Sequence, residues 1–362
     1  MRVFHYPLFL LLIAAFAFVG CEQSQTPLST PNSSAIDHAS LEKPNIGGTI
    51  VIANRASGSI SLIDASTDIV TDTHPLPAGD HTPEPMYVVY SHLNRTVFVG
   101  DRANDRVVVY DAETFSVKTT IPAGRGVFHM WADPRGKQLW VNNDIDNTIT
   151  VIDPMSFNVL KTIPIPTDLA NQGGKPHDVI LDPIGKYAYV SILGLPGNDI
   201  VVQYSTRLFT EMGRAEVGKD PHLSLTQKNN LLYVPCQNSD AVFLLDRDSM
   251  QQVDVLSVPG AHGAGMPLRG KTFYTTNLPG GGPAGLWSID VKSNTVLAHT
   301  DTPFAIPHNI ALTPEGDKLY ITHSGGSANK VSIYTVADGE QVPQLAGSVT
   351  VGLNPFGLAY VY

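Results

Sequence analysis

A short pattern that recurs seven times is the feature that most restricts how this 362-residue chain can fold. Each copy is a run of strand-forming residues that ends in a Y-V-x-N-like step and leads into a second such run, often ending in Asp. The seven copies of the first run are 50–54, 97–101, 139–143, 188–192, 232–236, 273–277 and 319–323. Val, Ile, Tyr and Thr between Gly, Pro, Asn and Asp predict short strands joined by tight turns.

The spacing of the copies predicts an all-β protein, a seven-bladed β-propeller. Each unit of about 40–50 residues holds four expected strands, the size of one propeller blade. The first unit, from Gly48, lacks an innermost strand, and the C-terminal segment GLNPFGLAYVY supplies a strand without a blade of its own. We therefore expect the ends of 48–362 to pair in one blade and close the ring.

The repeated step is similar to that of the YVTN β-propeller family. The resemblance covers Gly48 to Tyr362 and implies the propeller fold. It implies little about activity, because one fold carries many unrelated chemistries.

The N-terminus predicts export. Arg2 precedes an apolar run, 8–19, that is too short to span a bilayer and is followed by Gly20 and Cys21. This junction resembles the bacterial lipobox, which implies a signal peptide at 1–20, lipid on Cys21 and an anchor in the cell envelope, on its periplasmic side or at the cell surface. An ordinary signal peptide is the alternative, and it also exports the chain. Residues 21–47, rich in Ser, Pro and Thr, are expected to form a flexible tether.

The net charge and the cysteine content restrict which binding partners and ligands are expected. The formal net charge is −10 and there is no Lys/Arg run, which argues against nucleic-acid binding. With Cys21 lipidated, Cys236 has no cysteine left to pair with and is expected to be buried or to act as a ligand. No G-x-S-x-G, H-E-x-x-H, phosphate-loop or C-x-x-C-H motif occurs, so no catalytic residue is assigned.

Histidines recur near the expected start of the innermost strand in five consecutive blades. They are His129, His177, His222, His262 and His308, and the aligned positions of the other two blades hold Met86 and Phe356. Innermost strands line the channel of a propeller, so these side chains are expected to converge at one mouth. Neutral imidazoles there could bind copper, zinc, iron or nickel, whereas calcium and magnesium prefer oxygen.

A second set of candidates stands at the fourth position of the Y-V-x-N step, where Asn is commonest. Cys236 and His323 occupy it in two blades. Together with Met86 they are candidates for completing the metal shell, and thiolate and thioether ligands favour copper.

The histidine ring resembles the propeller domain of nitrous-oxide reductase, in which histidines of successive blades hold a copper cluster. The resemblance implies metal binding, with copper favoured, and redox chemistry as one use. It is not expected to extend to nitrous-oxide reduction, since Phe356 and Met86 replace two histidines.

Three functions stay open at this stage. The first is an exported, lipid-anchored metal-binding propeller that meets a protein or redox partner at its mouth. The second is an interaction scaffold in which the Pro-His steps are architectural. The third is a hydrolase or lyase that uses the imidazoles as bases.

Overall fold

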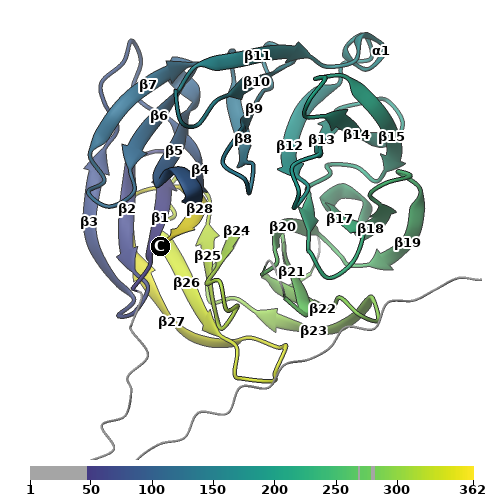
Figure 1. Cartoon of the computed structure of the whole chain (residues 1–362). Coiled ribbons are helices and arrows are strands. Elements are labelled where there is room, and N and C mark those ends of the chain that lie inside the picture. Colours follow the sequence, from purple (N-terminus) through teal and green to yellow (C-terminus); the bar gives the residue numbers. More distant parts are fainter. Residues whose placement is uncertain (1–46, 268–269, 279–281) are drawn as a thin grey trace, which may run out of the picture. The chain divides into compact units, whose positions relative to one another are not determined.

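Seven four-stranded antiparallel sheets are arranged around a central axis in the computed structural model (Figure 1). The structure describes residues 47–267, 270–278 and 282–362. The sequence-based expectation of an all-β, seven-bladed propeller is confirmed. The signal peptide, the lipidation site Cys21 and the tether up to residue 46 lie outside the described residues.

Each blade runs from an innermost strand near the axis to an outermost strand at the rim. Blade one contains β28 (Pro355–Val361), β1 (Thr49–Asn54), β2 (Ser59–Asp64) and β3 (Ile69–Pro75). Blade two contains β4 (Pro85–Ser91), β5 (Thr96–Asp101), β6 (Arg106–Asp111) and β7 (Val117–Pro122). Blade three contains β8 (Val127–Ala132), β9 (Leu139–Asn143), β10 (Thr148–Ile152) and β11 (Val159–Pro164).

The remaining blades follow the same order. Blade four contains β12 (Lys175–Leu181), β13 (Tyr187–Leu193), β14 (Asp199–Ser205) and β15 (Glu211–Val217). Blade five contains β16 (Ser224–Leu225), β17 (Leu231–Cys236), β18 (Ala241–Asp246) and β19 (Gln252–Ser257). Blade six contains β20 (Ala261–Gly265), β21 (Thr272–Asn277), β22 (Gly285–Asp290) and β23 (Thr295–Asp301). Blade seven contains β24 (Pro307–Leu312), β25 (Lys318–His323), β26 (Lys330–Thr335) and β27 (Gln344–Thr350).

Helices are short and lie in the connections. They are α1 (Thr167–Ala170) and the single 3₁₀ turns η1 (His92–Asn94), η2 (Arg102–Asn104) and η3 (Gln237–Ser239). Within the described part of the chain, no helix is long and apolar enough to cross a membrane.

The two ends of the propeller meet in blade one, as the missing strand predicted. The C-terminal strand β28 pairs antiparallel with β1, so that Ile50 faces Tyr360 and Ile52 faces Leu358. Pairing residues about 300 positions apart satisfies strand edges that would otherwise be exposed.

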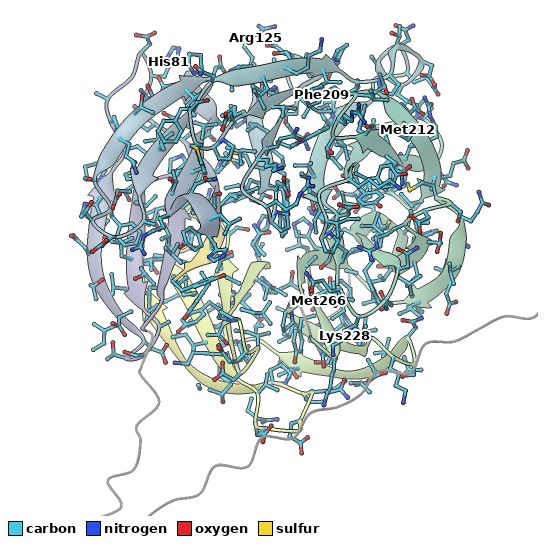
Figure 2. All side chains as sticks on the ribbon, in the orientation of Figure 1. His81, Arg125, Phe209, Met212, Lys228 and Met266 are labelled. Atoms are coloured by element: carbon cyan, nitrogen blue, oxygen red, sulfur yellow. The ribbon has the colours of Figure 1, made fainter. Side chains whose placement is uncertain are left out.

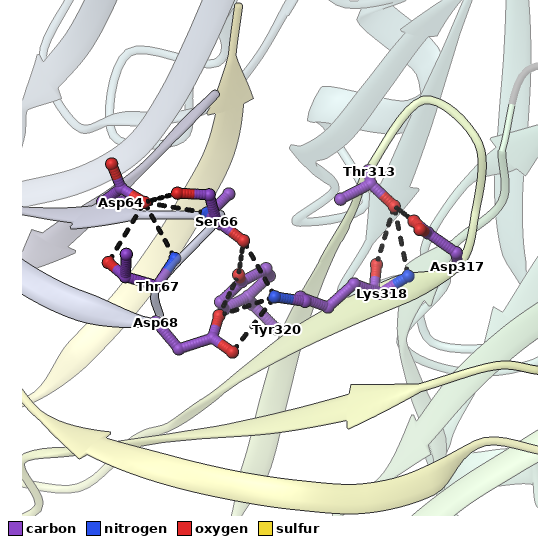
Figure 3. Close-up of polar contacts among 9 residues, drawn as sticks. Asp64, Ser66, Thr67, Asp68, Thr313, Asp317, Lys318 and Tyr320 are labelled. Carbon is purple, nitrogen blue, oxygen red and sulfur yellow. Dashed lines mark hydrogen bonds and ion pairs between the residues drawn. The ribbon is translucent and has the colours of Figure 1, made fainter. Parts of the chain in front are cut away.

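Polar contacts reinforce the seam between blades one and seven (Figure 3). The ammonium of Lys318 lies 3.0 Å from a carboxylate oxygen of Asp68 and donates to the carbonyl of Ala65 at 2.8 Å. The hydroxyl of Tyr320 donates to Asp68 at 2.5 Å. Asp68 follows the turn in which Asp64 accepts two backbone N–H groups, which positions it towards blade seven.

The hydrophobic core lies mainly between neighbouring blades rather than at the axis. The two middle strands of most blades are nearly fully buried and pack against the next blade. For example, Trp140 of blade three packs against Tyr204 and Phe209 of blade four, and Phe209 is labelled in Figure 2. The axis is therefore free to carry polar side chains.

Candidate metal centre

A backbone irregularity at the start of the innermost strands positions the candidate site. In six of the seven blades, the pairing of the innermost strand slips by one residue near its start. In blade four, the two residues between Pro176 and Val179 oppose a single residue of β13. Such a bulge bends the strand and redirects side chains. Here the two residues are His177 and Asp178, and both contact the same cluster near the axis.

Four histidines, not five, occupy the same position in consecutive blades. Each follows the residue that pairs with the fourth position of the Y-V-x-N step in the neighbouring strand: His177, His222, His262 and His308. In blade three that pairing residue is Val127, so Phe128 takes the equivalent position and His129 lies one residue further. The expectation of five equivalent histidines is wrong at this blade, which lacks the proline that marks the step in blades four, five and seven.

His129 nevertheless joins the others, because it stands on the bulge. Its ring centroid is 5.1 Å from that of His177 and 5.5 Å from that of His222. Along the ring, the His177–His222, His222–His262 and His262–His308 centroids are 4.7, 3.9 and 4.7 Å apart. Imidazoles from five blades thus form one cluster.

Burial keeps these imidazoles neutral. It lowers the pKa of all five below the ordinary 6.5, to about 3 for His222 and His308. Neighbouring rings lower the pKa of His177 and His262 further, since two imidazolium charges would repel. A neutral imidazole keeps one N–H and one lone pair, and the lone pair is what a metal binds.

The tautomer of His129 is set by Asp178. Its Nδ1 lies 2.9 Å from a carboxylate oxygen of Asp178, so Nδ1 carries the proton and donates it. Its Nε2 is buried and has no hydrogen-bond partner among the described residues. The ring of Tyr87 stacks on the imidazole with centroids 3.7 Å apart. His129 therefore presents a bare nitrogen from a fixed ring.

His177 and His222 face each other directly. Their Nε2 atoms are 3.3 Å apart, and the Nδ1 of His222 lies 3.8 Å from Asp178. Asp178 also accepts the backbone N–H groups of Val179 and Leu223 and so connects blades four and five. Burial raises its pKa above the ordinary value of 3.8. Its ion-pair contacts within the described ranges are with imidazoles rather than Lys or Arg.

His262 and Asp220 complete the cluster on the side of blades five and six. Both nitrogens of His262 are buried and lack a hydrogen-bond partner among residues that the structure describes. Asp220 precedes the Pro221-His222 step, and its carboxylate is 3.6 Å from Nε2 of His177. It adopts φ of 61°, in the left-handed region that Asp tolerates better than most residues.

The imidazole of His308 is held by an amide, whereas that of His129 is held by a carboxylate. The amide nitrogen of Asn309 lies 2.6 Å from its Nδ1 and 3.1 Å from the carbonyl oxygen of Phe356. Because an amide nitrogen only donates, Nδ1 of His308 accepts, and its proton is on Nε2. The ring also packs on Phe356 with centroids 4.2 Å apart.

The other side of the mouth is aromatic and apolar. Phe128 and Phe356 hold the ring position in blades three and one, and each lies beneath an arginine, Arg102 at 5.5 Å and Arg55 at 5.4 Å. Met86 is fully buried in the hydrophobic cluster that also contains Phe356. Apolar side chains thus hold the equivalent position in blades one to three, and imidazoles hold it in blades four to seven.

The fourth-position candidates make contacts within their own blades. In His323, Nδ1 lies 3.0 Å from the carbonyl oxygen of Ala305 and Nε2 lies 2.9 Å from the hydroxyl of Ser332. Asn54 and Asn143 make equivalent contacts to Ser61 and Thr150. Cys236 is fully buried, its thiol is 3.4 Å from the carbonyl of Val234, and burial raises its pKa.

Two sets of side chains in the described ranges could hold a metal ion. One is His129, His177 and His222, and the other is Asp220, His222 and His262; within each set the ligand atoms lie within 4.8 Å of one another. The sequence analysis identified all four histidines of these two sets. It did not identify the two carboxylates in the cluster, Asp178 and Asp220. The signal was present, because each carboxylate flanks a Pro-His step, as P-H-D and D-P-H.

Comparison with known proteins finds one matching family model, a partly similar protein and solved structures of the same fold. The model of the family described as "Lactonase, 7-bladed beta-propeller" matches residues 11–254. Protein NirF of Pseudomonas aeruginosa is 32% identical over 89 residues, which are 24% of this chain and 23% of NirF. The chain thus matches less than a quarter of the length of that relative.

Solved structures share the fold at low sequence identity. Hydrazine synthase of Kuenenia stuttgartiensis has a TM-score of 0.67 and 18% identity, covering 78% of this chain and 91% of that chain. The periplasmic gluconolactonase of Pseudomonas aeruginosa has a TM-score of 0.67 and 16% identity, covering 87% and 99%. At these identities the likeness concerns the fold alone.

Proposed function

The chain belongs to the family of seven-bladed β-propeller lactonases, and within it we propose that this protein is a transition-metal-binding propeller. The ion is held by His129, His177 and His222, with copper favoured. The observation that carries the proposal is a buried cluster of imidazoles in which Nε2 of His177 faces Nε2 of His222, and Nε2 of His129 has no hydrogen-bond partner among the described residues.

The distances suit a metal. A separation of about 3.3 Å is the spacing of two ligands in a tetrahedral site with metal–nitrogen bonds of about 2.0–2.1 Å. The Nε2 atoms of His177 and His222 are 3.3 Å apart. The fold already buries and orders these imidazole rings, so metal binding requires little further desolvation or ordering of their side chains.

The charges suit a cation as well. Asp178 and Asp220 contribute carboxylates at the cluster, and their ion-pair contacts within the described ranges are with histidines. A buried carboxylate without a cation is costly, and a bound divalent ion would offset that cost. An all-imidazole set with a nearby carboxylate is typical of copper and zinc rather than calcium or magnesium. The sequence resemblance to the propeller of nitrous-oxide reductase supports copper, and redox chemistry is one use of such a site.

Metal content of the full-length purified chain tests the proposal. We expect the protein, stripped with chelator and reloaded with Cu(II) or Zn(II), to retain metal after desalting. His177→Ala should remove most of it, because this ring supplies a ligand and faces His222. His299→Ala is the matched control, since that imidazole lies in the outermost strand β23 and contacts Asn277.

Two results would contradict the proposal. Absence of bound metal after reloading would leave the imidazoles as architecture and favour an interaction scaffold. Equal metal content in His177→Ala and wild type would move the binding site elsewhere.

Lactone hydrolysis is a second candidate, favoured by the family and by one contact. His129 has a carboxylate behind Nδ1 and a bare Nε2, the arrangement of a general base. If hydrolysis of glucono-1,5-lactone persists after chelation and is lost in His129→Gln, general-base catalysis by His129 becomes the favoured function. Hydrolysis that depends on reloaded metal would make the ion the activator of water.

We further propose that the chain is exported and anchored by lipid on Cys21. The apolar run ending at Gly20-Cys21 supports this. Mass spectrometry of the mature N-terminus should find a diacylglyceryl modification in wild type and none in Cys21→Ala. An unmodified Cys21 would favour an ordinary signal peptide. An anchored propeller could meet a protein or redox partner at its mouth.

A further inference from the structure

The geometry points to a second metal ion in the same cluster, held by Asp220, His222 and His262, with His222 shared between the two ions. This inference rests on the proposed function, because it presupposes the first ion. It makes ligands of a carboxylate and a histidine that do not bind the first ion.

The unpartnered state of His262 is the first argument. If one ion takes His129, His177 and His222, both nitrogens of His262 still lack a partner among the described residues, in a side chain more than nine-tenths buried. A buried polar atom without a partner costs about 1–3 kcal/mol, so such atoms call for an explanation. A second ion that binds one of these nitrogens supplies it.

The position of Asp220 is the second argument. Its carboxylate belongs to the set with His222 and His262, whose ligand atoms lie within 4.8 Å of one another. Its backbone N–H donates to Asp199 at 2.8 Å, which holds the residue beside the imidazoles.

The shared ligand is the third argument. His222 is common to both sets, and it stands between its neighbours, with centroids 4.7 Å from His177 and 3.9 Å from His262. His222 offers two nitrogens, Nε2 facing His177 and Nδ1 lying 3.8 Å from Asp178, and the ring can share them between two ions once it loses its proton. Two divalent ions would also balance the Asp178 and Asp220 carboxylates and a deprotonated His222 with one positive charge left over.

Zinc stoichiometry of the full-length chain tests this inference. We expect about two zinc ions per chain in wild type, and about one in Asp220→Asn and in His262→Gln. His308→Gln is the matched control for His262→Gln. It is equally buried and occupies the equivalent position in the next blade, but its Nδ1 already accepts from Asn309. It should retain about two ions.

Copper loading supplies a second readout. Two Cu(II) ions bridged by an imidazole couple magnetically, so wild type should give less EPR intensity than its copper content requires. Asp220→Asn should restore the full signal of one isolated Cu(II). Thermal unfolding of the metal-free variants, compared with His308→Gln, shows whether each is folded.

The outcomes separate the two claims. Two ions in wild type and one in both variants support the shared site. One ion in wild type overturns it while leaving the proposed function intact, whatever Asp220→Asn does. No ion in wild type overturns both.

Discussion

At the scale of single residues, the contact between Asp178 and His129 matters most for the chemistry. The carboxylate fixes the proton on Nδ1 and leaves Nε2 bare. Metal-binding histidines commonly depend on such a partner for ring orientation and basicity. In the proposed metal site Asp178 is therefore a positioning residue, which would act on the ion through the imidazole.

Asp178→Asn should weaken metal binding by roughly 10–100-fold, the usual effect of losing such a partner. An amide can present N–H to His129, which would move the imidazole proton to Nε2 and block the lone pair. The tautomer of His129, read from ¹⁵N shifts of the metal-free protein, should change from Nδ1–H to Nε2–H. A purely structural role for Asp178 would instead lower stability and leave the tautomer unchanged.

At the scale of elements, the inner strands approach one another so closely that two of them require glycine. A Cβ on Gly263 would lie 1.8 Å from the carbonyl oxygen of His308, and a Cβ on Gly357 would lie 2.6 Å from that of Met86. Backbone oxygens cannot move aside as flexible side chains can. These glycines let β20 approach β24, and β28 approach β4, beside the candidate site.

Gly263→Ala should therefore destabilise the protein by about 2–3 kcal/mol or more, as overpacked cores do. It should also displace His262 and reduce metal binding. Gly347→Ala in the outermost strand β27 is the control, because nothing lies within 4 Å of its Cβ position. Denaturant unfolding compares the two, and equal losses would show that the inner strands have room to separate.

The fourth-position histidine makes a pH-dependent contribution. Burial lowers the pKa of His323 to about 4, below the ordinary 6.5, so the unfolded chain binds this proton more readily. Stability from His323 is therefore complete above pH 6.5 and falls as pH drops from 6.5 to about 4. The slope in that window is at most about 1.4 kcal/mol per pH unit.

His323→Asn should remove this part of the pH dependence. Asparagine stands at the equivalent position in Asn54 and Asn143 and makes the equivalent contact there. Unfolding free energies measured between pH 4.5 and 7 should show a shallower slope for the variant than for wild type. Parallel curves would mean that His323 is accessible to protons in the folded protein.

Local sequence patterns predicted the fold more completely than they predicted the candidate site. The repeated strands and the missing inner strand predicted seven blades and their closure in blade one, because each depends on strand periodicity and turn residues. The position of His129 and Asp178 depends on a bulge, which adds one residue to the inner strand of six blades and leaves little trace in the sequence. The sequence pattern therefore places His129 in the wrong register and does not single out Asp178. His323 shows the converse, since its residue type suggested a ligand whereas its contacts lie within blade seven.

At the scale of the whole molecule, closure decides whether the site exists at all. The cluster draws on side chains from five blades, so their separation is set by the ring as a unit. The pairing of β28 with β1 inside blade one joins the two ends of the propeller, and the neighbouring seam between blades one and seven is reinforced by Asp68 with Lys318 and Tyr320. Opening this seam would loosen every imidazole contact.

Asp68→Asn should weaken the seam by about 1–2 kcal/mol, since it removes a charge from a partly buried, hydrogen-bonded ion pair. Asparagine tolerates the φ of 59° at this turn, so the backbone is expected to stay. The control is Glu113→Gln, whose exposed pair with Arg95 should contribute less than about 1 kcal/mol. Hydrogen exchange should accelerate first in β1, β28 and β25 if the ring opens at its seam. Uniform acceleration across the blades would mean instead that the propeller unfolds as one cooperative unit and that β28 pairing, not the polar contacts, holds it closed.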